Sequence, residues 1–158
     1  MGSGPKRRHR RPLIVFCSQT GNTRRVADAM AEPLNAEVLL IDQLKDHQLR
    51  GRPLIGLGSG VYWLRLARPI VDLAARLPAA SRVFIFSTSA WGPGWGPFYQ
   101  GDLAKKLDQR GIEIVDRWHG PGQDRNPLFK WMGISKGRPN AEDIQKARAF
   151  ARALRRTL

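Results

Sequence analysis

Short apolar runs alternate with helical patterns along most of the chain. Four of these runs are continuous: Leu13–Cys17, Val38–Ile41, Leu54–Leu57 and Val83–Phe86. Continuous apolar runs of this length are typical of strands that are covered on both faces, as in a parallel sheet. A fifth run, 112–115, is interrupted by a glutamate and therefore predicts an edge strand.

Between these runs, apolar residues recur at intervals of three and four positions. This spacing predicts helices around 26–34, 70–77, 103–107 and 144–158. The stretch 42–52 has room for only a short helix. Five strands that alternate with helices predict an α/β fold, in which a doubly wound, mainly parallel sheet carries helices on both faces.

Two local signals mark helix ends. Asn140 predicts the start of the last helix, because its side chain can cap the first turn while Asp143 complements the helix dipole. Gly111 predicts the end of the helix that precedes the fifth strand.

The length of 158 residues and the 42% of hydrophobic residues fit one domain. Residues 1–12 carry the basic run Lys6–Arg11 and no apolar residue beyond Met1, so we expect a flexible basic arm followed by one domain over 13–158. The first apolar run is too short for a membrane span or a signal-peptide core, so we expect neither membrane insertion nor export. A single cysteine excludes an internal disulfide and fits a reducing compartment, and we expect the cytoplasm.

In a sheet of this type, ligands bind outside the carboxyl ends of the strands where the strand order reverses. The first strand leads there into the segment Ser18-Gln19-Thr20-Gly21-Asn22-Thr23. A helix N-terminus presents unpaired N–H groups and a partial positive charge, and a glycine lets a ligand approach the backbone. We interpret the segment as a phosphate cradle; the alternative is an ordinary capped turn.

Other phosphate-binding motifs fail on spacing. The Walker pattern is absent, and the glycines at 56–60 lack the third glycine of the dinucleotide fingerprint. A cysteine phosphatase needs an arginine six positions after its cysteine, where this chain has Thr23. We therefore interpret Cys17 as a small core residue.

Two aromatic-rich segments follow the third and fourth strands. Tyr62 and Trp63 stand beside glycines, and Trp91 lies in the hydroxyl-rich segment 87–99. Rings at these positions can form flat walls for a planar heterocycle, although each could instead pack onto its own domain. The glycines at 58–60 predict a peptide that can reorient toward a bound ring. A phosphate cradle beside aromatic walls indicates flavin mononucleotide (FMN).

These residues resemble the flavodoxin superfamily over about 13–158. The resemblance rests on Ser-x-Thr-Gly-Asn-Thr after the first strand, and on 58–63, 86–89 and 136–140, which are similar to a branch that ends in a Lys-Gly-x-Pro-Asn segment. It implies a five-stranded parallel sheet of order 2-1-3-4-5. It also implies that 18–23 bind the FMN phosphate and that 59–63 and 88–92 bind the isoalloxazine. The implied cofactor-binding residues are Ser18, Gln19, Thr20, Gly21, Asn22, Thr23, Ser59, Gly60, Val61, Tyr62, Trp63, Thr88, Ser89, Ala90, Trp91 and Gly92.

Charge changes the expected partner. Typical flavodoxins are acidic, whereas this chain has 27 Lys and Arg residues against 13 Asp and Glu residues, a formal net charge of +14. Such a surface steers acidic partners by long-range attraction. We therefore expect an FMN-binding electron carrier that passes electrons between a reductase and an acidic redox protein.

Two alternatives remain open on the sequence. One is an FMN-dependent oxidoreductase, such as a quinone or nitro reductase or a protoporphyrinogen oxidase-like enzyme, although no acid and base pair stands out. The other is a protein that binds nucleic acid or another anionic surface through the basic arm and the basic segment 130–158.

The long connection 119–139 shows no clear regular element, and we expect it to be functional or mobile. Its apolar residues Phe129, Trp131 and Met132 either cap the flavin or cover the sheet edge, and the second interpretation is preferred. His119 has no ligand set near it in the sequence, so we expect a surface role for it rather than metal binding or acid–base chemistry.

Overall fold

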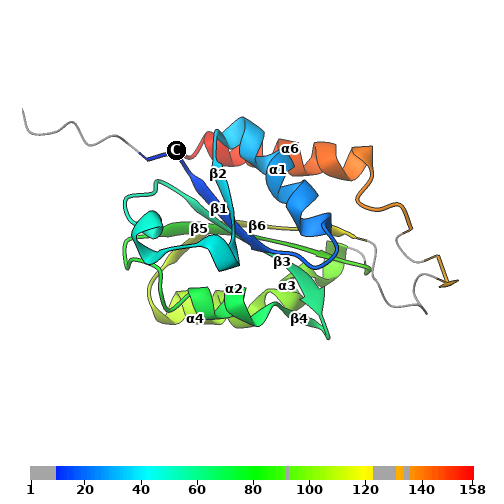
Figure 1. The fold of residues 1–158 in the computed structure, drawn as a ribbon, viewed down its shortest axis with the longest axis horizontal. Helices are drawn as coiled ribbons and strands as arrows, with labels where there is room; N and C mark the ends of the chain where they lie inside the picture. Colours follow the sequence, from blue (N-terminus) through cyan, green and yellow to red (C-terminus); the bar gives the residue numbers. More distant parts are fainter. Residues whose placement is uncertain (1–9, 92, 123–130, 134–135) are drawn as a thin grey trace, which may run out of the picture.

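The computed structural model describes residues 10–91, 93–122, 131–133 and 136–158. Figure 1 shows one parallel sheet between two layers of helices. In chain order the elements are β1 (Leu13–Cys17), α1 (Asn22–Leu34), β2 (Glu37–Leu40), η1 (Ile41–Gln43), η2 (Asp46–Leu49), β3 (Ile55–Tyr62), β4 (Arg65–Leu66), α2 (Arg68–Leu73), β5 (Arg82–Ser89), η3 (Pro93–Trp95), α3 (Gly96–Tyr99), α4 (Gly101–Gln109), β6 (Glu113–Pro121) and α6 (Ala141–Arg155).

The sheet confirms the predicted fold class. Its strands lie in the order β2-β1-β3-β5-β6, all pairing in parallel, which is the expected order 2-1-3-4-5. The structure adds one short strand, β4, which pairs antiparallel with the end of β3. The order reverses between β1 and β3, so their carboxyl ends frame the place where such folds bind ligands.

The strands are apolar on both faces because both faces are covered. On one face, Leu13 and Val15 of β1 belong to a core that also contains α2 and α4 residues such as Leu73 and Leu107. On the other face, Ile14 and Phe16 pack with residues of α1 and α6. Figure 1 shows α1 and α6 on one side of the sheet and α2, α3 and α4 on the other. The continuous apolar runs therefore had the predicted structural cause.

The glycines of β3 make room for aromatic rings. A Cβ atom at Gly56 would lie 2.3 Å from the Phe84 ring, and one at Gly58 would lie 2.0 Å from the Phe86 ring. Gly58 is also paired with strands on both sides, with Phe16 of β1 and with Phe86 of β5. The expectation of a reorientable peptide within 58–60 is therefore not supported at Gly58, because turning that peptide would break pairing on both sides. At Gly60, which pairs only with Thr88 of β5, it stays a prediction.

The predicted helix ends are confirmed. Asn140 accepts a hydrogen bond from the Asp143 N–H at 3.0 Å, and the Asp143 carboxylate accepts one from the Asn140 N–H at 2.8 Å. Arg138 forms an ion pair with Asp143, so this part of the Lys-Gly-x-Pro-Asn segment anchors the start of α6. Gly111 ends α4 with a φ of +67°. The stretch 42–52 forms two 3₁₀ turns, η1 and η2, instead of one short helix.

The last residues of the predicted arm contact the domain. Arg10 donates to the carbonyl oxygen of His47 at 2.8 Å, and the Glu37 N–H donates to the carbonyl oxygen of Pro12 at 2.9 Å. The rest of the arm, 1–9, lies outside the described residues. Within the described ranges, no helix is both long and apolar enough to cross a membrane.

Candidate functional site

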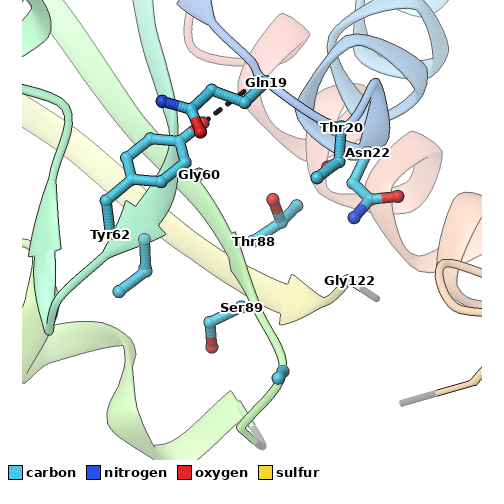
Figure 2. Close-up of a pocket in the computed structure, with 10 residues that line it drawn as sticks. Gln19, Thr20, Asn22, Gly60, Tyr62, Thr88, Ser89 and Gly122 are labelled. Carbon is cyan, nitrogen blue, oxygen red and sulfur yellow. Dashed lines mark hydrogen bonds between the residues drawn. The ribbon is translucent and has the colours of Figure 1, made fainter. Parts of the chain in front are cut away.

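A small cavity opens at the carboxyl ends of β1, β3, β5 and β6 (Figure 2). Its volume is about 80 Å³. The residues that line it are Gln19, Thr20, Asn22, Gly60, Val61, Tyr62, Thr88, Ser89, Ala90 and Gly122. All of them except Gly122 belong to the predicted set, so three segments far apart in the sequence meet where the topology requires.

The loop between β1 and α1 forms one wall of the cavity. Gly21 has a φ of +84°, a conformation that side chains with a Cβ rarely adopt, and no atom lies within 4 Å of where its Cβ would be. Gly21 is therefore required by the shape of the turn rather than by crowding. The first turn of α1 contains no acidic residue, so its N-terminus keeps the partial positive charge that favours an anion.

None of the described residues that line the cavity is charged. Arg24, in the first turn of α1, forms an ion pair with Asp28 at 3.7 Å, and its guanidinium carbon lies 5.8 Å from the centre of the Phe16 ring. An anion in this cavity would therefore be held by backbone N–H groups, hydroxyls and the Asn22 amide. This donor set suits a phosphate monoester better than a nucleotide polyphosphate.

Three predicted hydroxyl groups form hydrogen bonds within the protein and do not line the cavity. Ser18 accepts a hydrogen bond from the Gly21 N–H at 3.0 Å. The buried Thr23 hydroxyl pairs with that of Thr88 at 3.0 Å and so ties α1 to β5. Ser59 is fully buried and accepts from the Ala67 N–H at 2.8 Å. Among the hydroxyl residues of 18–23, this leaves Thr20 as the one that lines the cavity.

Of the three predicted stacking rings, only Tyr62 lines the cavity. Its hydroxyl accepts a hydrogen bond from the Gln19 N–H at 3.1 Å, so the ring reaches from β3 to the loop (Figure 2). Trp63 lies at the tip of the hairpin between β3 and β4 and is 97% exposed, and Trp91 is 44% exposed. Gly92 lies outside the described residues.

The β3–β4 hairpin has an uncommon turn. Its two central residues, Trp63 and Leu64, have φ values of +50° and +65°. A two-residue turn with both φ values positive is normally built from Asn and Gly, because a Cβ is strained in this region. The chain therefore holds two large apolar side chains in a costly conformation beside Tyr62.

His119 is not a simple surface residue, which corrects the sequence interpretation. Its Nδ1 atom lies 2.7 Å from the Ser87 hydroxyl and its Nε2 atom 2.9 Å from the Ser89 hydroxyl. Burial lowers the pKa of His119 to about 4, against a hydrogen bond to the Trp91 backbone that raises it. The imidazole is therefore neutral at physiological pH.

Two residues of this region were missed by the sequence reasoning. Gly122 follows the fifth strand, which the interrupted run 112–115 made look shorter than β6 is. His119 lies in the same strand, in register with Ser87. Two sequence signals pointed to this region: the alternation of Ser87 and Ser89, and the Gly-Pro-Gly sequence at 120–122. Neither signal shows that β6 lies beside β5 at these residues unless the register of the two strands is known.

Cys17 is partly buried and packs against the core, as predicted. Burial raises the pKa of its thiol, and Asp42 raises it further. A neutral thiol is a poor nucleophile, so the structure does not favour phosphatase chemistry.

The apolar residues of the long connection do not cover the sheet edge where they are described. Trp131 and Met132 are exposed, which goes against the preferred interpretation for these two, and Phe129 lies outside the described residues. A wider groove of about 520 Å³ lies between α2 and α4. Within it, Arg68 and Lys106 each pair with Asp72 at 3.6 Å.

Comparison with solved structures shows that the fold is similar to that of flavodoxins. No family model matches the chain. Flavodoxin 2 from Bacillus cereus is 19% identical with a TM-score of 0.72, and the match covers 94% of this chain and all of that one. A flavodoxin from the domain Archaea is 18% identical with a TM-score of 0.66, over 92% of this chain and 96% of that one.

The chain therefore has the flavodoxin-like fold. By sequence, the chain belongs to the same family as MJ0298, an uncharacterized protein of Methanocaldococcus jannaschii that is 31% identical over 145 residues. The match covers 90% of this chain and 96% of that relative. The fold that the family resemblance implied is thus confirmed.

The cavity fits one end of a flavin mononucleotide. Its donors are uncharged, and its floor is narrow, since a Cβ at Gly122 would lie 3.0 Å from the Asn22 amide nitrogen and 3.2 Å from the Thr88 Cβ atom. Pockets that enclose drug-sized ligands measure roughly 300–1,000 Å³, so a cavity of about 80 Å³ takes only a phosphate-sized group. A flavin ring would lie at its mouth, or Tyr62 would have to move away from Gln19.

Proposed function

We propose that this chain binds FMN and transfers electrons between a reductase and an acidic redox protein. The single observation that carries the proposal is the small cavity at the start of α1, whose described lining residues are uncharged, at the point where the strand order reverses. The flavodoxin-like fold supports flavin binding, and FMN is the flavin whose one phosphate such a cavity suits.

When bound, FMN supplies the redox chemistry. The residues of this chain have more limited tasks. The loop around Gly21 and Thr20 holds the phosphate through oriented N–H groups and a hydroxyl. Ser89 and Ala90 border the cavity from β5, and Tyr62 contributes the aromatic ring nearest to it. Together they orient the cofactor and keep water from its phosphate.

The charge of the chain supports the acidic partner. A formal net charge of +14 attracts acidic surfaces over distances of about 10 Å at moderate salt. We expect the rate of electron transfer to an acidic ferredoxin-type protein to fall steeply as salt is added. A cytoplasmic location belongs to the same proposal and is supported by the single, neutral cysteine.

The first experiment is spectroscopic. The full chain, purified and incubated with FMN, should carry the flavin absorption bands after gel filtration and release FMN on denaturation. A colourless protein that takes up no FMN at micromolar concentration would contradict the proposal.

A second experiment separates a carrier from an enzyme. The FMN-loaded chain is mixed with NADPH and a quinone, with and without an added flavodoxin reductase. We expect turnover only when the reductase is present. Turnover by the chain alone would favour the quinone reductase alternative, because the chain would then accept hydride directly. Salt-sensitive binding to duplex DNA by the full chain, with no uptake of FMN, would favour the nucleic-acid alternative.

A further inference from the structure

A chain of hydrogen bonds runs behind the cavity wall. It begins at the carbonyl oxygen of Trp118 and passes through Gln100, Ser87 and His119 to Ser89. Each of the four distances is between 2.7 and 2.9 Å. Ser89 lines the cavity. This series of hydrogen bonds therefore connects the buried Gln100 side chain, between α3 and α4, to the cavity.

One end of this chain fixes the direction of its bonds. The Trp118 carbonyl oxygen can only accept, so the Gln100 atom that faces it is the amide nitrogen Nε2, at 2.8 Å. The same nitrogen also lies 2.8 Å from the Ser87 hydroxyl oxygen, which must accept from it. The Ser87 hydroxyl then has its own proton to donate to His119 Nδ1.

The other end leads to the same result. The Ser89 hydroxyl donates its proton to the carbonyl oxygen of Trp91 at 3.0 Å. Its oxygen then accepts from His119 Nε2 at 2.9 Å. The same hydroxyl also has a hydrogen bond with Tyr99, and His119 has one with the Trp91 backbone. Both ends assign the proton of the imidazole to Nε2 and leave Nδ1 as the acceptor, so every group in the chain is satisfied.

The imidazole is also held sterically. A Cβ at Gly96 would lie 2.4 Å from the His119 Cβ atom, so α3 begins directly against it. The Tyr99 ring lies with its centre 5.5 Å from that of His119. His119 is thus packed closely against the start of α3 and the Tyr99 ring.

We propose that His119 is a positioning residue for the flavin pocket. Through its Nε2–H group, His119 holds Ser89 and the adjoining backbone of Ala90 and Trp91 in place. The proposal rests on the proposed function, because Ser89 and Ala90 border the cavity that would receive the cofactor. Its counterpart on the other side of the strand is the bond between Thr23 and Thr88. The two contacts fix successive residues of β5 from opposite faces.

A nucleophilic role for the same pair is not favoured. A serine nucleophile donates its proton to the base, whereas Ser89 donates to a carbonyl oxygen and accepts from His119. The lowered pKa of His119, caused mainly by burial, also makes the imidazole a weak base. The geometry therefore supports a fixed neutral donor.

The test begins on the full chain without cofactor. Long-range nitrogen–proton NMR spectra at pH 7 should show neutral His119 with its proton on Nε2, and amide exchange should show protected Ala90 and Trp91 N–H groups. In His119→Phe, which keeps a ring against Tyr99, exchange of these two amides should rise about tenfold or more, since a buried hydroxyl loses its donor. A proton on Nδ1, or unchanged exchange, would overturn the proposal.

The second arm measures FMN binding. His119→Phe should weaken FMN about tenfold, and His119→Gln, which keeps a donor and an acceptor, should recover part of the loss. His47→Phe is the matched control, because the His47 side chain is exposed in η2, and it should change neither reading. Ser87→Ala removes the partner of Nδ1 without touching the cavity and should give a smaller loss, which keeps the proposal testable if His119→Phe fails to fold.

The two arms separate the possible failures. If the unaltered chain binds no FMN, the proposed function fails while the NMR arm still decides whether His119 holds the wall. If the unaltered chain binds FMN and all His119 variants bind it equally well, the positioning role is overturned and the proposed function stands.

Discussion

The ring of Phe86 in β5 lies over Gly58 in β3, so close that a Cβ atom at Gly58 would come within 2.0 Å of it. Both residues are buried, and Phe86 is among the largest fully buried side chains of the protein. The strand that leads to the cavity thus depends on the absence of a side chain at this position. The pairing of Gly58 on both sides leaves the backbone little freedom to yield.

Gly58→Ala should therefore destabilise the fold by about 1–3 kcal/mol or more, as overpacking of a close-packed core does. Gly101→Ala is the matched control, since no atom lies within 4 Å of its Cβ position and it lies in α4. That change should be neutral or slightly stabilising, because alanine favours helix over glycine. Urea unfolding of both variants checks the difference, and equal stability would show that the Phe86 ring can yield.

Gly21→Ala should weaken FMN binding by about tenfold, because a residue with a Cβ at a φ of +84° distorts the loop that would hold the phosphate. Gly51→Ala carries the same kind of strain, with a φ of +67°, far from the cavity. Both variants should lose about 1 kcal/mol of stability. Only the first should lose affinity, and an equal loss in both would point to a global effect.

The hairpin turn gives a prediction of the opposite sign. Replacing Leu64, which has a φ of +65°, by glycine should raise the stability by about 1 kcal/mol, because glycine adopts this conformation without strain. The melting temperature of Leu64→Gly should rise accordingly. Since both φ values of the turn are positive, a fall in the melting temperature would show that the Leu64 side chain stabilises the hairpin by contacts that outweigh the strain.

The stability should depend on pH through His119. Its pKa is lowered from 6.5 to about 4 by burial, so the unfolded chain takes up a proton at higher pH than the folded one. The contribution of the neutral imidazole is complete above pH 6.5 and is lost as the pH falls from 6.5 to 4. It amounts to at most about 3–4 kcal/mol, at about 1.4 kcal/mol per pKa unit.

His119→Gln should remove this part of the pH dependence, which unfolding at pH 7 and pH 5 can measure. Tyr99 is the titratable side chain that faces His119, and its pKa is raised by burial, so it stays neutral across this range. An unchanged pH dependence in the variant would mean that other groups cause the acid sensitivity.

The sequence predicted the fold well because each of the four inner apolar runs carries its own strand signal. Runs such as Leu13–Cys17 are apolar throughout, and that pattern arises only when both faces are covered. The loop at Gly21 is equally local, since strand, glycine and helix are consecutive. The cavity could therefore be located from the ends of β1, β3 and β5 alone.

What could not be predicted depends on contacts across the sheet. Ser59 and Thr23 look like ligand-binding hydroxyls in the sequence, but each bonds to a partner from another element. His119 is defined by the register of β6 against β5, which a bulge between Val83 and Phe84 shifts. Trp63 faces solvent because β4 creates a hairpin that the pattern of apolar residues does not indicate.

The most direct measurement is a fluorescence titration of the full, cofactor-free chain with FMN and, separately, with riboflavin, which lacks the phosphate. If the loop after β1 holds the phosphate, FMN should bind at micromolar concentration or below and riboflavin about 100-fold more weakly, since the phosphate makes several charge-assisted hydrogen bonds. Equal affinity for the two, or no binding of either, would contradict a phosphate-anchored flavin site.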